Sequence, residues 1–164
     1  MNKLICRIFK TLMLVVATTA YASEEKPNNV LEIATSYITA MYDQDFRKVP
    51  ELAAPDLQFE SPTAEPGFVP SQSSRDAVIE SWSHGMTDME QEWEITRSFS
   101  SHDKAVFYMT TVGTAPGEFF GHEAKTVAYK VDGVAVVQVV NGLVVRHSGY
   151  MDYPAMFAGL RPVE

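Results

Sequence analysis

Apolar residues recur at intervals of three and four along residues 30–41, directly after a polar stretch at 23–28. This spacing predicts an amphipathic helix, and Asn28 or Asn29 can cap it by accepting the first free amide hydrogens. The residues on its buried face would be Val30, Ala34, Tyr37, Ile38 and Met41.

A shorter second helix is predicted next. Asp45 can cap it, and Pro55 would end it because proline has no amide hydrogen to continue a helix. Residues 57–61 then predict a short strand. Residues 62–74 follow as a loop, since prolines and glycines stand there among small polar residues.

A third helix is predicted after this loop. Ser73 and Asp76 have the spacing of a capping box. Apolar residues then return at helical spacing, which predicts another amphipathic face. Its buried residues would be Ala77, Val78, Trp82, Met86 and Met89.

The rest of the chain predicts sheet. Residues 92–100, 104–114 and 125–153 are rich in Val, Thr, Tyr and Phe, the residues that strands favour. Asn141-Gly142 predicts a tight hairpin turn, because both residues tolerate a positive φ. Asp132-Gly133 predicts either a second turn or a bulge within one long strand.

The hairpin at Asn141-Gly142 predicts a strand register with two apolar faces. Both faces need cover, and the three helices can cover only one of them. The simplest second cover is another copy of the chain, so we expect a homodimer through the sheet. The expected pairs are Val139–Val144 and Val137–Arg146 on one face, and Val140–Leu143 and Val136–His147 on the other.

The first residues have the three-part pattern of a secretory signal peptide. Three basic residues precede an apolar run at 11–17, and Ala20-Tyr21-Ala22 stands before Ser23. The run is shorter than the roughly 18 to 20 residues of a membrane-spanning helix. We therefore predict that residues 1–22 are a signal peptide cleaved after Ala22, that 23–164 form one domain, and that the protein is periplasmic or secreted without a stable membrane anchor.

Composition and charge narrow the function. The 164 residues are 46% hydrophobic and 21% charged, which suits one globular domain, and the net charge of -8 argues against binding nucleic acid. The single cysteine, Cys6, lies in the predicted signal peptide, so a thiolate site is not expected in the mature chain. The four histidines show no metal-binding spacing, and no phosphate-binding glycine loop occurs, so neither metal nor cofactor is expected.

Three helices followed by strands predict an α+β domain. We expect a cone shape, with the three N-terminal helices packed on a strongly curved mixed or antiparallel sheet that encloses an apolar cavity. Three stretches, SYITAMYD at 36–43, LAAPDLQFESP at 52–62 and NGLVVRHSGYMD at 141–152, resemble the nuclear transport factor two-like superfamily. This superfamily includes ketosteroid isomerase and the SnoaL-like polyketide cyclases.

The resemblance implies two site residues. Tyr37 matches the isomerase tyrosine that donates a hydrogen bond to the enolate oxygen, and Asp152 matches the acid/base aspartate of SnoaL-like cyclases and the base of limonene epoxide hydrolase. Ser61 stands where the isomerase has its catalytic aspartate. The arginine and aspartate that the hydrolase requires are absent from 107–111, so the resemblance leaves Asp152 as the candidate base and Tyr37 as the candidate hydrogen-bond donor.

The predicted site is built around Asp152. A carboxyl group that faces an apolar hollow has a raised pKa and can act as a base; the alternatives are that Asp152 caps the tail at 153–160 or pairs with an arginine. By alternation His147 would lie on the opposite face, at the dimer interface. The expected catalytic residues are Asp152, Tyr37 and Tyr150, and the expected ligand-binding residues are Phe59, Ser61, Trp82, Tyr108 and Ser148.

Two functions follow from this set. The first is an exported, cofactor-independent acid/base enzyme of the cyclase, isomerase or dehydratase type, acting on a small apolar carbonyl compound. The second is a non-catalytic periplasmic module that binds a small hydrophobic ligand or a protein in the same hollow. The absence of the isomerase base at Ser61 favours the second.

Overall fold

The structure is a computed structural model that describes residues 29–63 and 71–163; the predicted signal peptide lies outside them. Within these ranges, none of the helices combines the length and apolar character needed to cross a bilayer. The elements in chain order are α1 (Val30–Tyr42), α2 (Val49–Leu52), β1 (Ala53–Glu60), α3 (Arg75–Met86), β2 (Glu90–Ser101), β3 (Lys104–Pro116), the 3-10 helix η1 (Gly117–Phe120), β4 (Thr126–Val140), β5 (Leu143–Met151), α4 (Tyr153–Ala158) and β6 (Arg161–Pro162).

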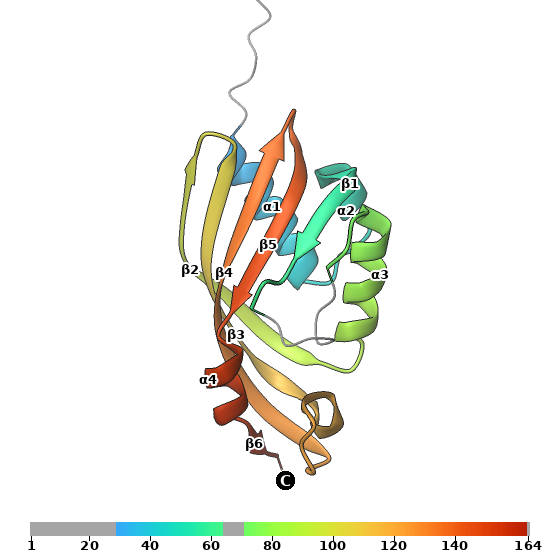
Figure 1. Cartoon of the computed structure of the whole chain (residues 1–164), viewed down its shortest axis with the longest axis vertical. Coiled ribbons are helices and arrows are strands. Elements are labelled where there is room, and N and C mark those ends of the chain that lie inside the picture. Colours follow the sequence, from blue (N-terminus) through green and yellow to red (C-terminus); the bar gives the residue numbers. More distant parts are fainter. Residues whose placement is uncertain (1–28, 64–70, 164) are drawn as a thin grey trace, which may run out of the picture.

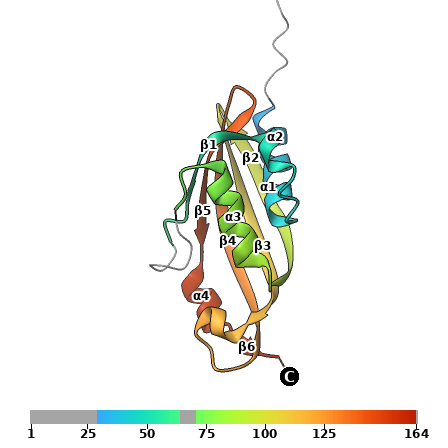
Figure 2. The same cartoon turned by 90° about the vertical axis from the view of Figure 1, so that its right-hand side faces the viewer.

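The strands form one mixed sheet in the order β1-β5-β4-β3-β2, with β6 paired to β4. β1 runs parallel to β5, and the other neighbours are antiparallel. The N-terminal helices α1 and α3 lie on one side of this sheet (Figures 1 and 2). The prediction of an α+β fold with helices packed on a mixed sheet is therefore confirmed.

The sheet is not strongly curled, which corrects the sequence prediction. Its two long central strands, β3 and β4, pair from Lys104–Gln138 to Pro116–Thr126 without a register shift. A sheet bends sharply where a bulge interrupts the ladder, and this ladder has none. The long regular pair therefore limits the curvature.

Capping side chains determine where the helices begin. The Asn29 side chain accepts a hydrogen bond from the Glu32 amide at 3.2 Å, as predicted for the first helix. Ser74, not Ser73, caps α3 by accepting from the Ala77 amide at 3.3 Å. This helix ends at Met86, so the predicted extension to Met89 is wrong.

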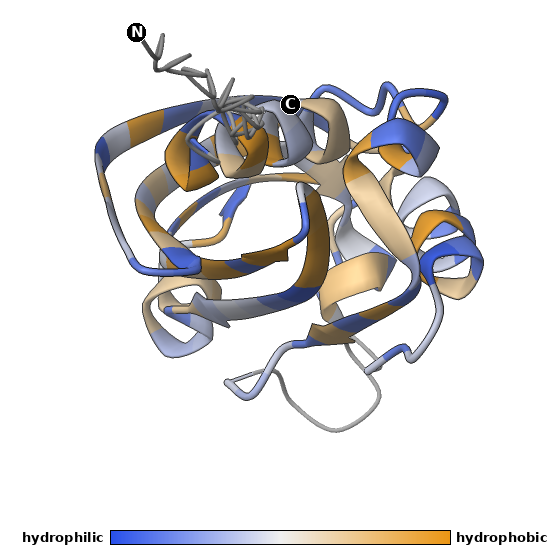
Figure 3. Cartoon of the chain, turned by 90° about the horizontal axis from the view of Figure 1, so that it is seen from above, coloured by the Kyte–Doolittle hydropathy of each residue, from blue (hydrophilic) through white to orange (hydrophobic). Residues whose placement is uncertain are grey.

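The core lies between α1 and the inner face of the sheet. Tyr37, Ile38 and Met41 of α1 are fully buried there, together with Phe107 of β3 and Val137 of β4. Hydrophobic and hydrophilic residues alternate along the strands, and Figure 3 shows them as alternating bands of colour. The periodicity that predicted the elements therefore also identifies the side chains that hold them together.

The hairpin turn is confirmed, but its register changes after two pairs. Asn141 and Gly142 have φ values of 51° and 80°, as the turn requires. Val140–Leu143 and Val139–Val144 pair as predicted. The register then shifts, so that the next pairs are Gln138–Arg146, Val137–His147 and Val136–Ser148.

This shift is a bulge that leaves one extra residue, Val145, in β5. The predicted pairs Val137–Arg146 and Val136–His147 are therefore wrong. A shift of one residue moves the following side chains to the opposite face of the sheet. His147 is consequently buried on the inner face, 1% exposed, and does not lie on the outer face.

Asp132-Gly133 forms neither a turn nor a bulge, because β4 continues through it in register with β3. A Cβ on Gly133 would meet the Met151 sulfur on the neighbouring strand. Glycine at this position lets β5 pack closely and lets Met151 occupy the space.

Candidate functional site

An apolar pocket of about 180 Å³ lies between α3, the inner face of the sheet and α4. Asp152 and Pro154 begin α4 directly after β5, because the carboxylate accepts a hydrogen bond from the Ala155 amide and proline fits the first turn. This start brings Tyr153 and Met156 to the pocket wall. The other aromatic and methionine residues of the wall are Tyr42, Phe59, Trp82, Met86, Met89, Phe119, Phe120, Tyr129 and Met151.

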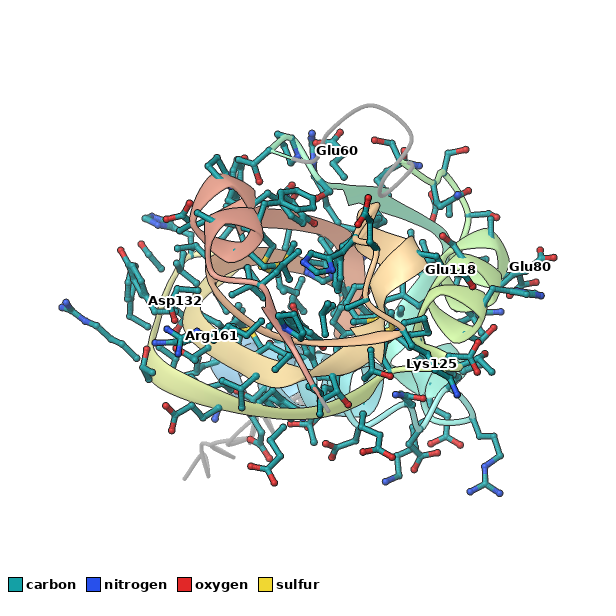
Figure 4. The ribbon with its side chains drawn as sticks, turned by 90° about the horizontal axis from the view of Figure 1, so that it is seen from below. Glu60, Glu80, Glu118, Lys125, Asp132 and Arg161 are labelled. Carbon is teal, nitrogen blue, oxygen red and sulfur yellow. The ribbon has the colours of Figure 1, made fainter. Side chains whose placement is uncertain are left out.

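The described residues that line the pocket include no Asp, Glu, Lys or Arg. Their polar groups are hydroxyls, the Gln91 amide and the His147 ring, and the Tyr129 hydroxyl already donates to Gln91 at 3.3 Å. Figure 4 shows the labelled charged residues Glu60, Glu80 and Asp132 at the periphery of the domain. A charged ligand would lose its hydration in this pocket without gaining an ionic partner.

His147 is the polar residue at the centre of the site. Its Nδ1 lies 3.3 Å from the Tyr37 hydroxyl oxygen. Its Nε2 is the only buried side-chain nitrogen or oxygen in the described part of the chain that lacks a hydrogen-bond partner. The imidazole also contacts the rings of Phe59 and Trp82, with centroid distances of 5.1 and 5.9 Å.

Burial determines the charge state of this group of side chains. Burial lowers the pKa of His147 to about 4, so the imidazole is neutral at pH 7. Burial also raises the pKa of Tyr37, so its phenol stays protonated. The pKa of Tyr42 is likewise raised, first by burial and then by the nearby Tyr153 and Tyr129. The pocket therefore offers neutral hydrogen-bonding groups.

Three of the sequence-predicted ligand-binding residues, Phe59, Ser61 and Trp82, line this pocket. Tyr37 lies behind it and is fully buried, and it reaches the site through His147. The structure therefore brings these three residues and Tyr37 to one site.

The remaining predicted residues lie elsewhere. One face of β5 carries Ser148, Tyr150 and Asp152, as predicted. This face is the outer one, because side chains alternate along a strand and His147 points inward. Tyr150 and Tyr108 are each 42% exposed, and both line a separate outer hollow with Asp152.

Asp152 is exposed and caps α4, with 3.1 Å between its Oδ1 and the Ala155 amide nitrogen. The prediction that it faces an apolar hollow is therefore wrong, and the capping alternative describes its position. It does not pair with Arg146, which instead binds Glu60 at 2.7 Å.

Sequence reasoning missed His147 as a pocket residue. Alternation along the strand predicted that His147 and Asp152 lie on opposite faces, and this is correct. The prediction placed the site on the face of Asp152, whereas the pocket lies on the face of His147. Only the bulge at Val145 turns His147 inward, and no turn residue marks that bulge in the sequence.

The buried imidazole predicts a specific pH dependence of stability. Above pH 6.5 it is neutral in both the folded and unfolded states. As the pH falls from 6.5 towards 4, the unfolded chain gains a proton that the folded protein does not bind, so the folded state loses about 3 kcal/mol. Urea unfolding at pH 7.5 and pH 4.5 should show most of this loss.

His147→Phe is the control, because it keeps a ring of similar size and removes the titrating group. Its stability should fall less over the same pH interval, since only the carboxylates shared with the parent protein still contribute. An equal fall in both proteins would show that His147 binds a proton without penalty while folded.

Comparisons with known proteins agree with this architecture. One similar structure comes from Shewanella putrefaciens CN-32 and is described as a SnoaL-like polyketide cyclase. It is 19% identical to this chain, and the alignment covers 77% of this chain and 92% of that chain with a TM-score of 0.69. A structure from Shewanella denitrificans OS-217 with the same description is 20% identical. The alignment covers 77% of this chain and 93% of that chain with a TM-score of 0.69. At these identities the likeness shows the fold alone.

A third structure, an LEH-like epoxide hydrolase from M. tuberculosis, is 15% identical, with 79% of this chain and 87% of that chain aligned at a TM-score of 0.63. No curated protein gives a significant match. The family model of the SnoaL-like domain matches residues 34–147, which is more than half of the chain. The sequence resemblance is thereby confirmed, and the chain belongs to the SnoaL-like domain family.

Proposed function

We propose that this protein binds a small, neutral and mainly apolar molecule in the pocket beside His147. The main support for this proposal is the composition of the pocket wall, in which aromatic rings and methionines surround uncharged polar groups. Such a wall stabilises apolar surface and offers nothing to compensate a buried charge. The volume of about 180 Å³ suits a small ligand, since an apolar cavity of about 150 Å³ is known to bind benzene.

Catalysis on such a molecule is the second candidate, favoured by the contact between Tyr37 and His147. A cofactor-independent reaction of the cyclase, isomerase or dehydratase type needs a group that polarises a carbonyl. His147 can supply that group, whereas Asp152 is exposed and is not among the residues that line the pocket, although its neighbours Met151 and Tyr153 are. Binding remains the primary proposal, since no carboxylate base is present among the described lining residues.

Two probes of similar size test the binding proposal. Acetophenone is neutral and benzoate is anionic at pH 7.5, so acetophenone should raise the melting temperature by a few degrees at millimolar concentration and benzoate should not. Thermal unfolding followed by circular dichroism measures both. An equal effect of benzoate would contradict the neutral pocket.

A blocked pocket supplies the control. Gly85 lines the pocket, and a Cβ added there would meet nothing within 4 Å. Gly85→Leu should therefore fill the space and abolish the acetophenone effect. His84→Leu changes an exposed position of the same helix and should leave that effect intact.

We also propose that the outer face of the sheet binds a second copy of the chain. Its centre holds two rows of side chains that cross neighbouring strands. Phe99, Tyr108 and Tyr150 expose 42–45% of their surface here, and a contiguous exposed apolar patch is typical of an interaction surface. The two rows are Tyr150, Val134 and Tyr108, which Arg97 continues on β2, and Val136, Val106 and Phe99.

Charges on either side of these rows favour a second copy as the partner. Glu94 and Asp132 form an acidic row next to the first apolar row, and Asp152 extends it. Lys104 lies in the row beyond the second, and so does Arg146, which also pairs with Glu60 of its own chain. A twofold axis that runs along the apolar rows would place the acidic row of each copy opposite the basic row of the other.

We also propose that the protein is exported. The basic, apolar and small-residue segments of 1–22 support secretion, with cleavage after Ala22. An exported protein would meet small apolar molecules outside the cytoplasm. The pocket proposal itself rests on residues of the folded domain and does not depend on this location.

A further inference from the structure

We infer that Tyr37 holds His147 in the tautomer that carries its proton on Nε2, and that this N–H binds an oxygen atom of the ligand. The ligand class is then a small apolar compound with a carbonyl oxygen. This inference rests on the proposed binding function and names the group that the pocket recognises.

The tautomer follows from the hydrogen bonds of Tyr37. In the described part of the chain, its buried hydroxyl contacts no other hydrogen-bonding group than His147 Nδ1. If Nδ1 carried the proton, it would donate to the hydroxyl oxygen, and the hydroxyl hydrogen would be left without an acceptor. If Nε2 carries the proton, the Tyr37 hydroxyl donates to Nδ1 and both groups are satisfied.

The second arrangement leaves a single unsatisfied group, the Nε2–H of His147. The imidazole is held between the rings of Phe59, Trp82 and Tyr37, so it has little freedom to turn towards another partner. An N–H without an acceptor is unfavourable in apolar surroundings. His147 is part of the pocket wall although less than 1 Å² of its Nε2 is exposed, so a ligand that displaces a neighbouring wall side chain can supply that acceptor.

A carbonyl oxygen fits this position better than a hydroxyl or a carboxylate. It accepts a hydrogen bond and brings no proton that needs a partner of its own. A carboxylate would also accept, but its charge would be buried in a wall that has no cation among its described residues. Tyr37 is therefore a positioning residue, because it acts on the ligand through the imidazole.

Nitrogen-15 NMR of histidine-labelled protein at pH 7.5 tests the tautomer. The expected His147 spectrum has a protonated Nε2 and an unprotonated Nδ1. In Tyr37→Phe the donor to Nδ1 is removed, and signal from the other tautomer should appear. A parent protein with its proton on Nδ1 would overturn the inference.

A matched pair of ligands tests the oxygen anchor. Acetophenone and ethylbenzene have similar size, and only the first has a carbonyl oxygen. The affinity ratio of acetophenone to ethylbenzene, measured by NMR titration, should fall about tenfold in His147→Phe. Comparison of ratios removes the difference in hydration between the two probes, which is the same for both proteins.

The outcomes separate this inference from the binding proposal. If both probes bind and the ratio is the same in the parent protein and in His147→Phe, the pocket is real and the anchor is wrong. If neither probe binds the parent protein, the proposed function itself fails. Tyr37→Phe should bind ethylbenzene like the parent protein while its ratio falls, which a purely structural role of Tyr37 would not produce.

Discussion

Phe107→Ala is expected to lower the free energy of unfolding by about 3–5 kcal/mol. Phe107 is fully buried in the core that joins α1 to the inner face of the sheet. Removal of its ring loses the burial of a large apolar surface and leaves a cavity that neighbouring side chains on a regular sheet fill only in part. Urea unfolding measures the change at one fixed protein concentration, because dimer formation would make stability depend on concentration.

Val112→Ala is the control on the same strand. Val112 points to the outer face and is 40% exposed, so its replacement should cost less than about 1 kcal/mol. Equal losses for the two variants would mean that α1 does not pack on β3 as the structure has it.

Reversal of one charge on the outer face is expected to weaken the proposed dimer by about tenfold or more. In that dimer Glu94 faces the basic row that contains Lys104 of the other copy. Glu94→Lys would bring like charges together, and the twofold axis repeats the change at a second, equivalent place. Sedimentation equilibrium at physiological salt measures the dissociation constant, and higher salt should reduce the difference.

The double variant gives the decisive comparison. Lys104→Glu alone should weaken association like Glu94→Lys, and the two together should restore much of it. Within one chain Glu94 pairs with Thr110, which is six residues from Lys104 along β3, or roughly 20 Å. This is beyond the Debye length of about 8 Å at physiological salt, so the rescue must come from contact between copies. Two single variants that associate like the parent protein would contradict the proposed orientation.

The three N-terminal helices and the hairpin turn could be predicted from the sequence because their causes are local. Helical spacing around Tyr37 and Ile38, the cap at Asn29 and the Asn141-Gly142 turn all act within a few residues. The order of the elements and the stretches at 36–43, 52–62 and 141–152 indicated the family, and the family model confirms it.

The site was predicted in part. Phe59, Trp82 and Tyr37 lie at or behind the pocket because an apolar stripe on a helix or strand faces the core wherever that core is. Asp152 was misplaced because its position depends on which face of β5 the helices cover. The sequence between Leu143 and Met151 is apolar enough on both faces to leave that choice open.

By itself, then, the sequence determined the element types, the hairpin turn, the acidic character and the family, since each depends on composition or on neighbouring residues. Only the tertiary structure decided that a bulge at Val145 turns His147 inward to Tyr37, and that Asp152 caps α4 on the outer face. The physical reason is that a strand has a period of two, so one extra residue exchanges its faces. The position of the extra residue, Val145, depends on how the whole sheet packs against the helices. No local sequence pattern contains that information.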